Sequence, residues 1–235
     1  MNGTGRSVVL PATRLVWDLP VRIVHWLLVL CVTGSWLTHL AGLQWFAWHR
    51  RFGCVTLVLV SFRVAWGFVG TRHARFANFL RGPRAVVAYL RGGGPAEPVG
   101  HNPLGALSVV ALLALMLLQA VTGLFANDEI ASAGPFYGWV SPATSNRVTA
   151  LHHANADWLL ALIALHVAAV AWHAFVRRKP LLRAMVTGRK DSGRVPDSEA
   201  IAGSRTALAV AIAAAFALAL ALAIRAAPEA AIALF

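Results

Sequence analysis

Long apolar runs alternate with shorter polar segments along the whole chain. Five runs stand out, at about residues 21–40, 51–70, 104–125, 153–175 and 206–226. A helix that crosses a bilayer needs roughly twenty mostly apolar residues, and each run has about this length. The pattern therefore predicts an all-α integral membrane protein with five transmembrane helices.

Two of the predicted helices carry clear starting signals. Asp18 and Pro20 stand at the beginning of the first run, and Asn102 and Pro103 at the beginning of the third. An aspartate or asparagine side chain can accept hydrogen bonds from free backbone N–H groups, and proline suits the first turn. Residues 83–90 can form one further, short helix that lies along the membrane surface.

Basic residues gather in alternate connections between the apolar runs. Most of them lie in residues 1–20, 71–103 and 176–205, whereas residues 41–50 and 126–152 contain few. Positively charged loops stay preferentially on the cytoplasmic side of a membrane. We therefore expect the N-terminus in the cytoplasm and the C-terminus outside.

Composition narrows the class of protein further. Hydrophobic residues make up 58% of the 235 residues and charged residues 13%, far from the soluble average. The net charge of +12 is divided among separate segments, so membrane topology explains it better than nucleic-acid binding does. Cys31 and Cys54 lie inside apolar runs, which leaves neither a disulfide framework nor a Cys-x-x-Cys-His haem attachment.

Histidines inside the predicted helices are the most informative residues, because ionisable groups within a membrane are costly and usually functional. His25 lies near the cytoplasmic end of the first helix, and His49 and His152 mark the outer starts of the second and fourth. His166 follows His152 by 14 positions, which corresponds to a rise of roughly 21 Å and close to four whole turns. One face of the fourth helix can thus offer an imidazole near each membrane surface, opposite His49 and His25.

These positions predict two bis-histidine sites, an arrangement that suits iron in a helical bundle. His173 lies seven positions beyond His166 and is a reserve ligand for the inner site. Two alternatives are a structural metal ion and histidines that only hydrogen-bond to one another, although zinc normally needs four clustered ligands. The other histidines lie near loops or helix ends, where we expect exposed or interfacial side chains: His39, His73, His101 and His153.

An arginine inside the second apolar run supports a haem at the inner level. Arg63 follows His49 by 14 positions and so lies on the same helix face at the other end. A buried guanidinium needs an anion, and a haem propionate would supply one. Arg22, three residues before His25, could bind the same haem, or it could extend to the lipid headgroups.

Several segments together resemble one known family, the bacterial cytochrome b561 and nickel-iron hydrogenase b-type subunit superfamily, which is related to the membrane subunit of formate dehydrogenase. The similarity covers about residues 14–190. The matching segments are residues 17–26 (WDLPVRIVHW), 48–53 (WHRRFG), 63–70 (RVAWGFVG), 100–103 (GHNP), 151–166 and 184–190 (AMVTGRK).

The resemblance implies a four-helix transmembrane bundle that holds two non-covalent haem b groups. It pairs His25 with His166 at the cytoplasmic-side haem and His49 with His152 at the periplasmic-side haem, and it favours His166 over His173. The fifth helix lies outside this shared core. The expected parts are a cytoplasmic segment 1–20, the di-haem core 21–190, a cytoplasmic linker 191–205, and the fifth helix with an outer tail, 206–235.

The resemblance also implies an electron-transfer function in the bacterial inner membrane. Relatives exchange electrons with quinone, in some cases near a polar residue at the start of the third helix. Asn102 occupies that position here, with Gly105 leaving room for a ring. The expected redox partner is a periplasmic c-type cytochrome or a dehydrogenase or hydrogenase subunit, in a membrane lipid environment and possibly in a homo-oligomer.

Two rival functions remain open at this level. One is a self-sufficient quinone-linked oxidoreductase such as a superoxide oxidase, which would need no protein partner. The other is a haem-free membrane anchor or metal transporter, which would show no Soret band. The superoxide oxidase would work with quinone and superoxide alone, whereas the electron relay would need a partner such as a c-type cytochrome or a dehydrogenase subunit.

Overall fold

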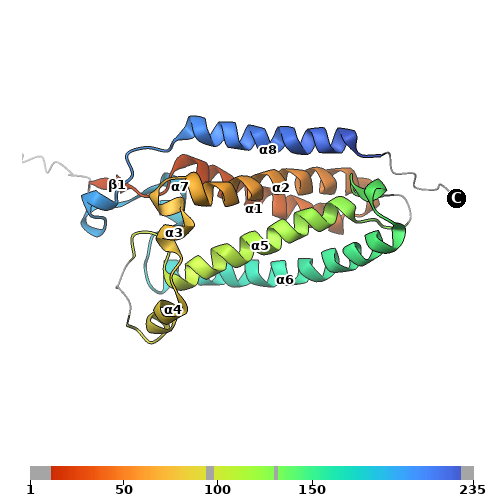
Figure 1. Cartoon of the computed structure of the whole chain (residues 1–235). Coiled ribbons are helices and arrows are strands. Elements are labelled where there is room, and N and C mark those ends of the chain that lie inside the picture. Colours follow the sequence, from red (N-terminus) through yellow and green to blue (C-terminus); the bar gives the residue numbers. More distant parts are fainter. Residues whose placement is uncertain (1–11, 94–97, 130–131, 229–235) are drawn as a thin grey trace, which may run out of the picture.

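The structure is a computed structural model, and it describes residues 12–93, 98–129 and 132–228. Five of the described helices are long and apolar enough to cross a membrane, and Figure 1 shows them running side by side. The predicted N-terminal residues 1–11 and the end of the outer tail, 229–235, lie outside the described residues. The long helices are α1 (Leu19–Leu40), α2 (Phe46–Val69), α5 (Pro103–Phe125), α6 (Pro142–Phe175) and α8 (Thr206–Ala226).

The shorter elements lie mostly at one end of the bundle (Figure 1). They are the helices α3 (Phe76–Phe79), α4 (Pro83–Leu90) and α7 (Leu181–Thr187), and the strands β1 (Thr13–Leu15) and β2 (Arg189–Asp191). Single 3-10 turns occupy Leu43–Trp45, Arg72–Ala74, Tyr137–Trp139, Ser192–Arg194 and Asp197–Glu199. This end carries the basic connections, so it is the predicted cytoplasmic end.

The predicted helix caps are confirmed. The Asp18 carboxylate accepts a hydrogen bond from Val21 N at 2.7 Å, and Asn102 Oδ1 accepts one from Gly105 N at 2.7 Å. Each cap satisfies a backbone N–H that has no partner within its own helix. The start of the first and third spans is therefore fixed by the residues that the sequence pattern singled out.

The prediction that the fourth helix begins near residue 153 was wrong. Helix α6 begins at Pro142, because Ser141 caps it through Thr144 N at 3.2 Å and proline suits its first turn. His152 thus lies well inside α6 instead of marking its outer start. The second helix also begins earlier than predicted, at Phe46.

Asp18 does more than cap α1, because its carboxylate is 1% exposed and joins three segments. Its second oxygen accepts hydrogen bonds from Trp66 Nε1, at 3.1 Å, and from the Thr71 hydroxyl. Charge-assisted hydrogen bonds of this kind are stronger than neutral ones. The N-terminus of α1 is thereby tied to the C-terminal end of α2.

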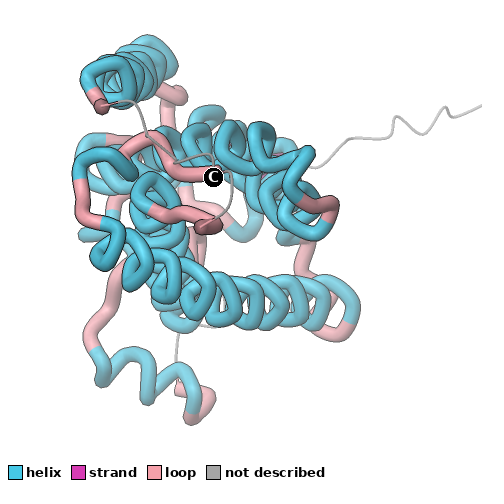
Figure 2. The backbone as a smooth tube through the Cα atoms, turned by 90° about the vertical axis from the view of Figure 1, so that its right-hand side faces the viewer, coloured by secondary structure: helices cyan, strands magenta, loops and turns pink. Residues whose placement is uncertain are grey.

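The bundle core lies between α1, α2, α5 and α6, with Val60, Phe62 and Trp66 of α2 almost fully buried. Small residues allow close approach of the helices, as membrane bundles require. A Cβ at Gly34, for example, would lie 2.7 Å from the Phe52 ring. Helix α8 packs mainly on α2, and it lies at the edge of the bundle in both views (Figures 1 and 2).

The predicted cytoplasmic linker, residues 191–205, is held firmly against the rest of the chain. Strand β1 pairs antiparallel with β2, so that Arg14 lies opposite Lys190. Ile201 N donates to Leu15 O at 3.0 Å, and Arg72 forms an ion pair of 2.6 Å with Glu199. Together, β1, β2 and residues 192–201 make a cap over one end of the bundle, which we call the basic-end cap.

Candidate functional site

The outer histidine pair lies where the sequence pattern placed it. His49 is in the first turns of α2 and His152 is in α6, and their ring centroids are 6.4 Å apart with the planes at 79°. Two imidazoles that bind one metal ion, each through a nitrogen at about 2 Å, have these two nitrogens roughly 4 Å apart. The ring centroids lie farther apart than the facing nitrogens, so a centroid separation of 6.4 Å leaves space for one metal ion between the rings.

Hydrogen bonds fix the orientation of both rings. The Nδ1 atom of His49 lies 2.8 Å from Ser35 O, and that of His152 lies 3.1 Å from Gln119 O. A carbonyl oxygen can only accept, so Nδ1 carries the hydrogen in each case and Nε2 keeps its lone pair. Metal-binding histidines usually donate their second nitrogen to a carbonyl in this way.

Gln119 occupies the lone pair of His152 in this structure. Its side-chain nitrogen lies 3.0 Å from His152 Nε2, while its oxygen accepts a bond of 2.6 Å from Asn155. Asn155 also donates to Leu115 O, at 3.0 Å, so its amide nitrogen is the donor to Gln119. Gln119 Nε2 therefore donates to His152 Nε2, and a metal ion could bind this nitrogen only if the Gln119 side chain turned away.

A cavity of about 390 Å³ surrounds the outer pair. Ligand cavities typically measure about 300–1,000 Å³, so this one can admit a large group. Two glycines shape it: a Cβ at Gly53 would meet nothing within 4 Å, whereas one at Gly123 would lie 3.0 Å from His152 Cε1. Open space beside His49 and a close-fitting His152 together fit a planar group such as a porphyrin.

We expect Gly53→Leu to lower the outer haem content and Gly53→Ala to retain it. The leucine side chain would enter the open space next to His49, whereas alanine adds one methyl group and favours the helix by about 1 kcal/mol. The haem-to-protein ratio of each purified variant measures the effect. Equal ratios for both variants would mean that this space does not hold a haem.

Two further histidines line the same cavity. His39 and His153 are exposed, as expected, but their ring centroids lie 6.1 Å from His49 and from His152, respectively, and 6.3 Å from each other. No group of three or more His, Cys, Asp or Glu side chains within the described residues is arranged to hold a metal ion.

The inner pair consists of His25 on α1 and His166 on α6. The two imidazoles are near enough for the charge of one to act on the other. His25 Nδ1 is buried and has no hydrogen-bond partner within the described residues. In contrast to the outer pair, the inner pair lacks hydrogen bonds to backbone carbonyls in the described part of the chain.

Arg63 is the clearest sign of a missing anion near the inner pair. It is 6% exposed, and its NH1 atom is buried without a partner among the described residues. Its guanidinium carbon lies over the Phe76 ring, 5.7 Å from the ring centroid. Because a buried guanidinium without an acceptor is costly, this position fits a haem propionate. Arg22, by contrast, donates to Val186 O at 2.5 Å, with only its Nε unpartnered.

Two histidines expected to be exposed or interfacial lie at the basic end: His73 is buried, contrary to that prediction, whereas His101 is half-buried. His73 is 6% exposed and lies 2.8 Å from Glu199 O through Nε2. His101 packs edge-on between Trp17 and Phe79, each at 4.7 Å. Burial, followed by the charges of Arg63 and Lys190, lowers the pKa of His101 to about 3. The prediction failed for His73 because its ring contacts Glu199 of the basic-end cap, and the cap depends on contacts that are distant in sequence.

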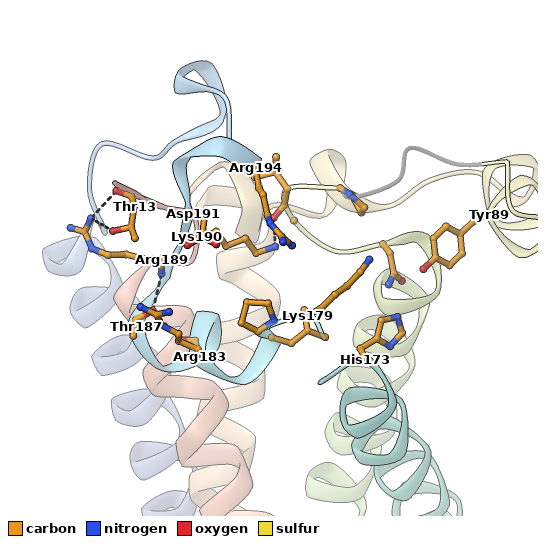
Figure 3. Close-up of a pocket in the computed structure, with 16 residues that line it drawn as sticks. Thr13, Tyr89, His173, Lys179, Arg183, Thr187, Arg189, Lys190, Asp191 and Arg194 are labelled. Atoms are coloured by element: carbon orange, nitrogen blue, oxygen red, sulfur yellow. Dashed lines mark hydrogen bonds between the residues drawn. The ribbon is translucent and has the colours of Figure 1, made fainter. Parts of the chain in front are cut away.

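A second cavity, of about 190 Å³, lies at the basic end. Asn102 and Tyr89 line it together with His173, the reserve ligand, whose Nδ1 lies 2.8 Å from Ala169 O. Figure 3 shows Tyr89 and His173 on one side of this cavity and Arg189 on the other. Gly105 does not line it, and a Cβ there would lie 3.2 Å from Asn102 Oδ1. The cationic lining residues are Lys179, Arg183, Arg189, Lys190 and Arg194.

Comparison with known proteins finds relatives that this chain covers over most of their length. A family model described as prokaryotic cytochrome b561 matches residues 16–188. A probable Ni/Fe-hydrogenase B-type cytochrome subunit from Azotobacter chroococcum mcd 1 is 29% identical over 223 residues, covering 80% of this chain and 92% of the relative. Proteins of the same description from Rhizobium leguminosarum bv. viciae and Rhodobacter capsulatus are 27% and 26% identical and cover 74% of this chain each, and 87% and 80% of the relatives.

Proposed function

The chain belongs to the prokaryotic cytochrome b561 family, and we propose that it holds two haem b groups that pass electrons across the membrane. As a member of this family, it is a b-type cytochrome that crosses the membrane several times and takes part in electron transfer. In our proposal electrons move between the quinone pool, at the basic end, and a redox partner at the other end. The basic end faces the cytoplasm of a bacterium, and the other end faces the periplasm.

The outer histidine pair carries this proposal. His49 and His152 line one cavity, and the Nδ1 of each lies within hydrogen-bond distance of a backbone carbonyl, so Nε2 is the nitrogen of each ring that can bind iron. For His152 the Gln119 amide would have to give way first. A haem b held by two imidazoles supplies a reversible one-electron carrier. His49 and His152 would together hold this haem and leave its iron no open coordination position, so no general acid or base would be needed there.

The inner pair completes the path toward the basic end. His25 and His166 are the proposed ligands, and Arg63 is the proposed partner of a propionate. Arg22 is a weaker candidate for that role, because it already binds the backbone of α7. The 14-residue spacing on α6 sets the two sites roughly 21 Å apart along the membrane normal, which suits transfer between its two faces.

The names of the relatives support a hydrogenase subunit as the redox partner. Their descriptions call them cytochrome subunits of Ni/Fe-hydrogenases. For this chain we propose a hydrogenase, another dehydrogenase, or a c-type cytochrome as the partner at the outer face. A stand-alone superoxide oxidase is excluded if the purified protein reduces quinone with the partner but not with superoxide.

The cavity at the basic end is the proposed quinone site. Asn102 uses Oδ1 for the α5 cap, which leaves its amide nitrogen for a quinone carbonyl. His173 donates Nδ1–H to Ala169 O, so Nε2 can take a proton from a quinol. The cavity is smaller than a typical drug-sized site, about 300–1,000 Å³, so it suits a ring whose tail remains in the lipid.

We expect Asn102→Ser and His173→Gln each to slow quinol-driven haem reduction by roughly two- to tenfold, since a hydrogen bond contributes about 0.5–1.5 kcal/mol and each 1.36 kcal/mol is about a factor of ten in rate. Serine keeps the helix cap and removes only the amide. Stopped-flow absorbance of the haems after mixing with decylubiquinol gives the rate. Wild-type rates in both variants would place the quinone site elsewhere, whereas no reduction of the wild type would refute quinone exchange altogether.

A further inference from the structure

The cavity around the outer histidine pair changes character along the membrane normal. Leu159 lines it seven positions after His152 on α6, which is roughly 10 Å deeper in the membrane. At the other end Arg50 of α2 lines it together with Asn127 and Asp128, from the connection between α5 and α6. The cavity is therefore apolar at its inner end and polar at its outer end.

Arg50 brings a positive charge to the outer end of this cavity. Its NH1 atom donates to Ala133 O at 3.3 Å, which is longer than the usual distance of about 2.7–3.2 Å. No carboxylate among the described residues lies within 4.0 Å of its nitrogens. Asp128 lines the same cavity, but its Oδ1 atom accepts from Ser132 N at 2.8 Å instead of pairing with Arg50. The described part of the chain thus leaves the Arg50 charge without a paired anion.

A haem b would match this division of the cavity in only one orientation. It has a flat apolar ring with two carboxylates, the propionates, at one edge. A propionate at the inner end would place a negative charge deep in the membrane, which is costly. The Thr56 hydroxyl lines that end and is buried without a hydrogen-bond partner among the described residues, but a neutral hydroxyl cannot balance a carboxylate. The propionates are therefore expected at the outer end, beside Arg50.

We propose that Arg50 binds a propionate of the outer haem and so fixes the haem with its propionate edge toward the outer face. This rests on the proposed function, since it requires a haem on His49 and His152. A guanidinium has five N–H donors, so Arg50 can keep its bond to Ala133 O and still bind a carboxylate by charge-assisted hydrogen bonds. The axial ligand His49 and the positioning residue Arg50 are then neighbours in one turn of α2.

A positive charge at the propionate alters the redox equilibrium of the haem. Reduction adds one negative charge to the haem, and a nearby guanidinium stabilises that charge, strongly so where water is excluded. Loss of the Arg50 charge should therefore lower the midpoint potential of the outer haem. We expect a roughly tenfold change in the one-electron equilibrium, which corresponds to about 59 mV.

Four substitutions separate this contact from the general charge of the outer end. Arg50→Gln removes the charge, whereas Arg50→Lys keeps it but loses the planar fork that fits a carboxylate. Arg51→Gln is the matched control, because Arg51 lies over the Trp48 ring, 4.7 Å from its centroid, and is not among the described residues that line the cavity. Thr56→Val tests the reverse orientation of the haem, since it removes the hydroxyl at the inner end and keeps the shape.

Redox titration of the full-length protein in detergent gives both midpoint potentials, and the haem-to-protein ratio shows whether both haems are bound. The His49→Ala variant, which should keep only the inner haem, assigns the two potentials. We expect a lower outer-haem potential in Arg50→Gln, a smaller decrease in Arg50→Lys, and wild-type values in Arg51→Gln and Thr56→Val. The inner-haem potential should stay unchanged in these four variants. Loss of the outer haem from Arg50→Gln alone would also support the contact.

Equal decreases in Arg50→Gln and Arg51→Gln would overturn the proposal, because the haem would then respond only to the total charge of this end. An unchanged outer potential in Arg50→Gln, with both haems bound, would overturn it too. A decrease in Thr56→Val without one in Arg50→Gln would reverse the orientation of the haem. A wild type with fewer than two haems would instead refute the proposed function.

Discussion

Alanine at His49 or at His152 should remove the same haem, so that each variant binds one haem per chain instead of two. The two rings face each other at 6.4 Å, and neither can hold a haem in a six-coordinate state alone. The double variant should lose no more than either single variant. Haem-to-protein ratios and redox difference spectra of the purified proteins measure the loss.

The structure itself supplies the matched control for this prediction. His39 and His153 line the same cavity, and their rings are 6.3 Å apart, close to the separation of the proposed ligands. Within the described residues, however, their Nδ1 atoms form no hydrogen bond with a backbone carbonyl. Alanine at either residue should therefore retain both haems. Haem loss from those variants, with retention in the His49 and His152 variants, would reassign the outer ligands.

Asp18→Ala should lower the stability of the protein by clearly more than the loss of a helix cap alone. It removes the α1 cap, worth about 0.5–2 kcal/mol, and leaves Trp66 Nε1 and the Thr71 hydroxyl buried without an acceptor, at about 1–3 kcal/mol each. We expect a decrease in the free energy of unfolding of about 3 kcal/mol or more. Denaturant unfolding in detergent micelles, followed by far-UV circular dichroism, measures it.

Asn102→Ala is the control for Asp18→Ala, because Asn102 caps α5 and makes no recorded bond to another segment. Its expected loss is that of a cap alone, about 1 kcal/mol. Asp18→Asn keeps part of the hydrogen bonding, so its loss of stability should lie between those of Asp18→Ala and Asn102→Ala. If Asp18→Ala lost no more than Asn102→Ala, the bonds to Trp66 and Thr71 would contribute nothing to stability.

Hydropathy and capping signals predicted most of the helical fold. The last apolar run coincides with α8 at both ends, since Thr206–Ala226 is apolar almost throughout. The start of α6 was missed because its first turns, from Pro142, contain polar residues that hydropathy assigns to a loop. The signal was present in Ser141 and Pro142, a cap followed by a first-turn proline.

The candidate site was predictable where helix geometry alone decides it. Spacing on two helices was enough to bring His49 and His152 together. It could not reveal the bonds to Ser35 and Gln119, which orient the rings through contacts with other helices. Nor could it reveal the burial of His73, because the residue of the basic-end cap that contacts its ring, Glu199, is 126 positions away in the sequence.

Two haem b groups per chain can be tested by the haem-to-protein ratio of the purified protein together with its reduced-minus-oxidised spectrum. We expect a ratio of two, with both haems low-spin and six-coordinate, because each iron would have two imidazole ligands. A colourless protein, a ratio near one, or a high-spin signal from an open axial position would contradict it.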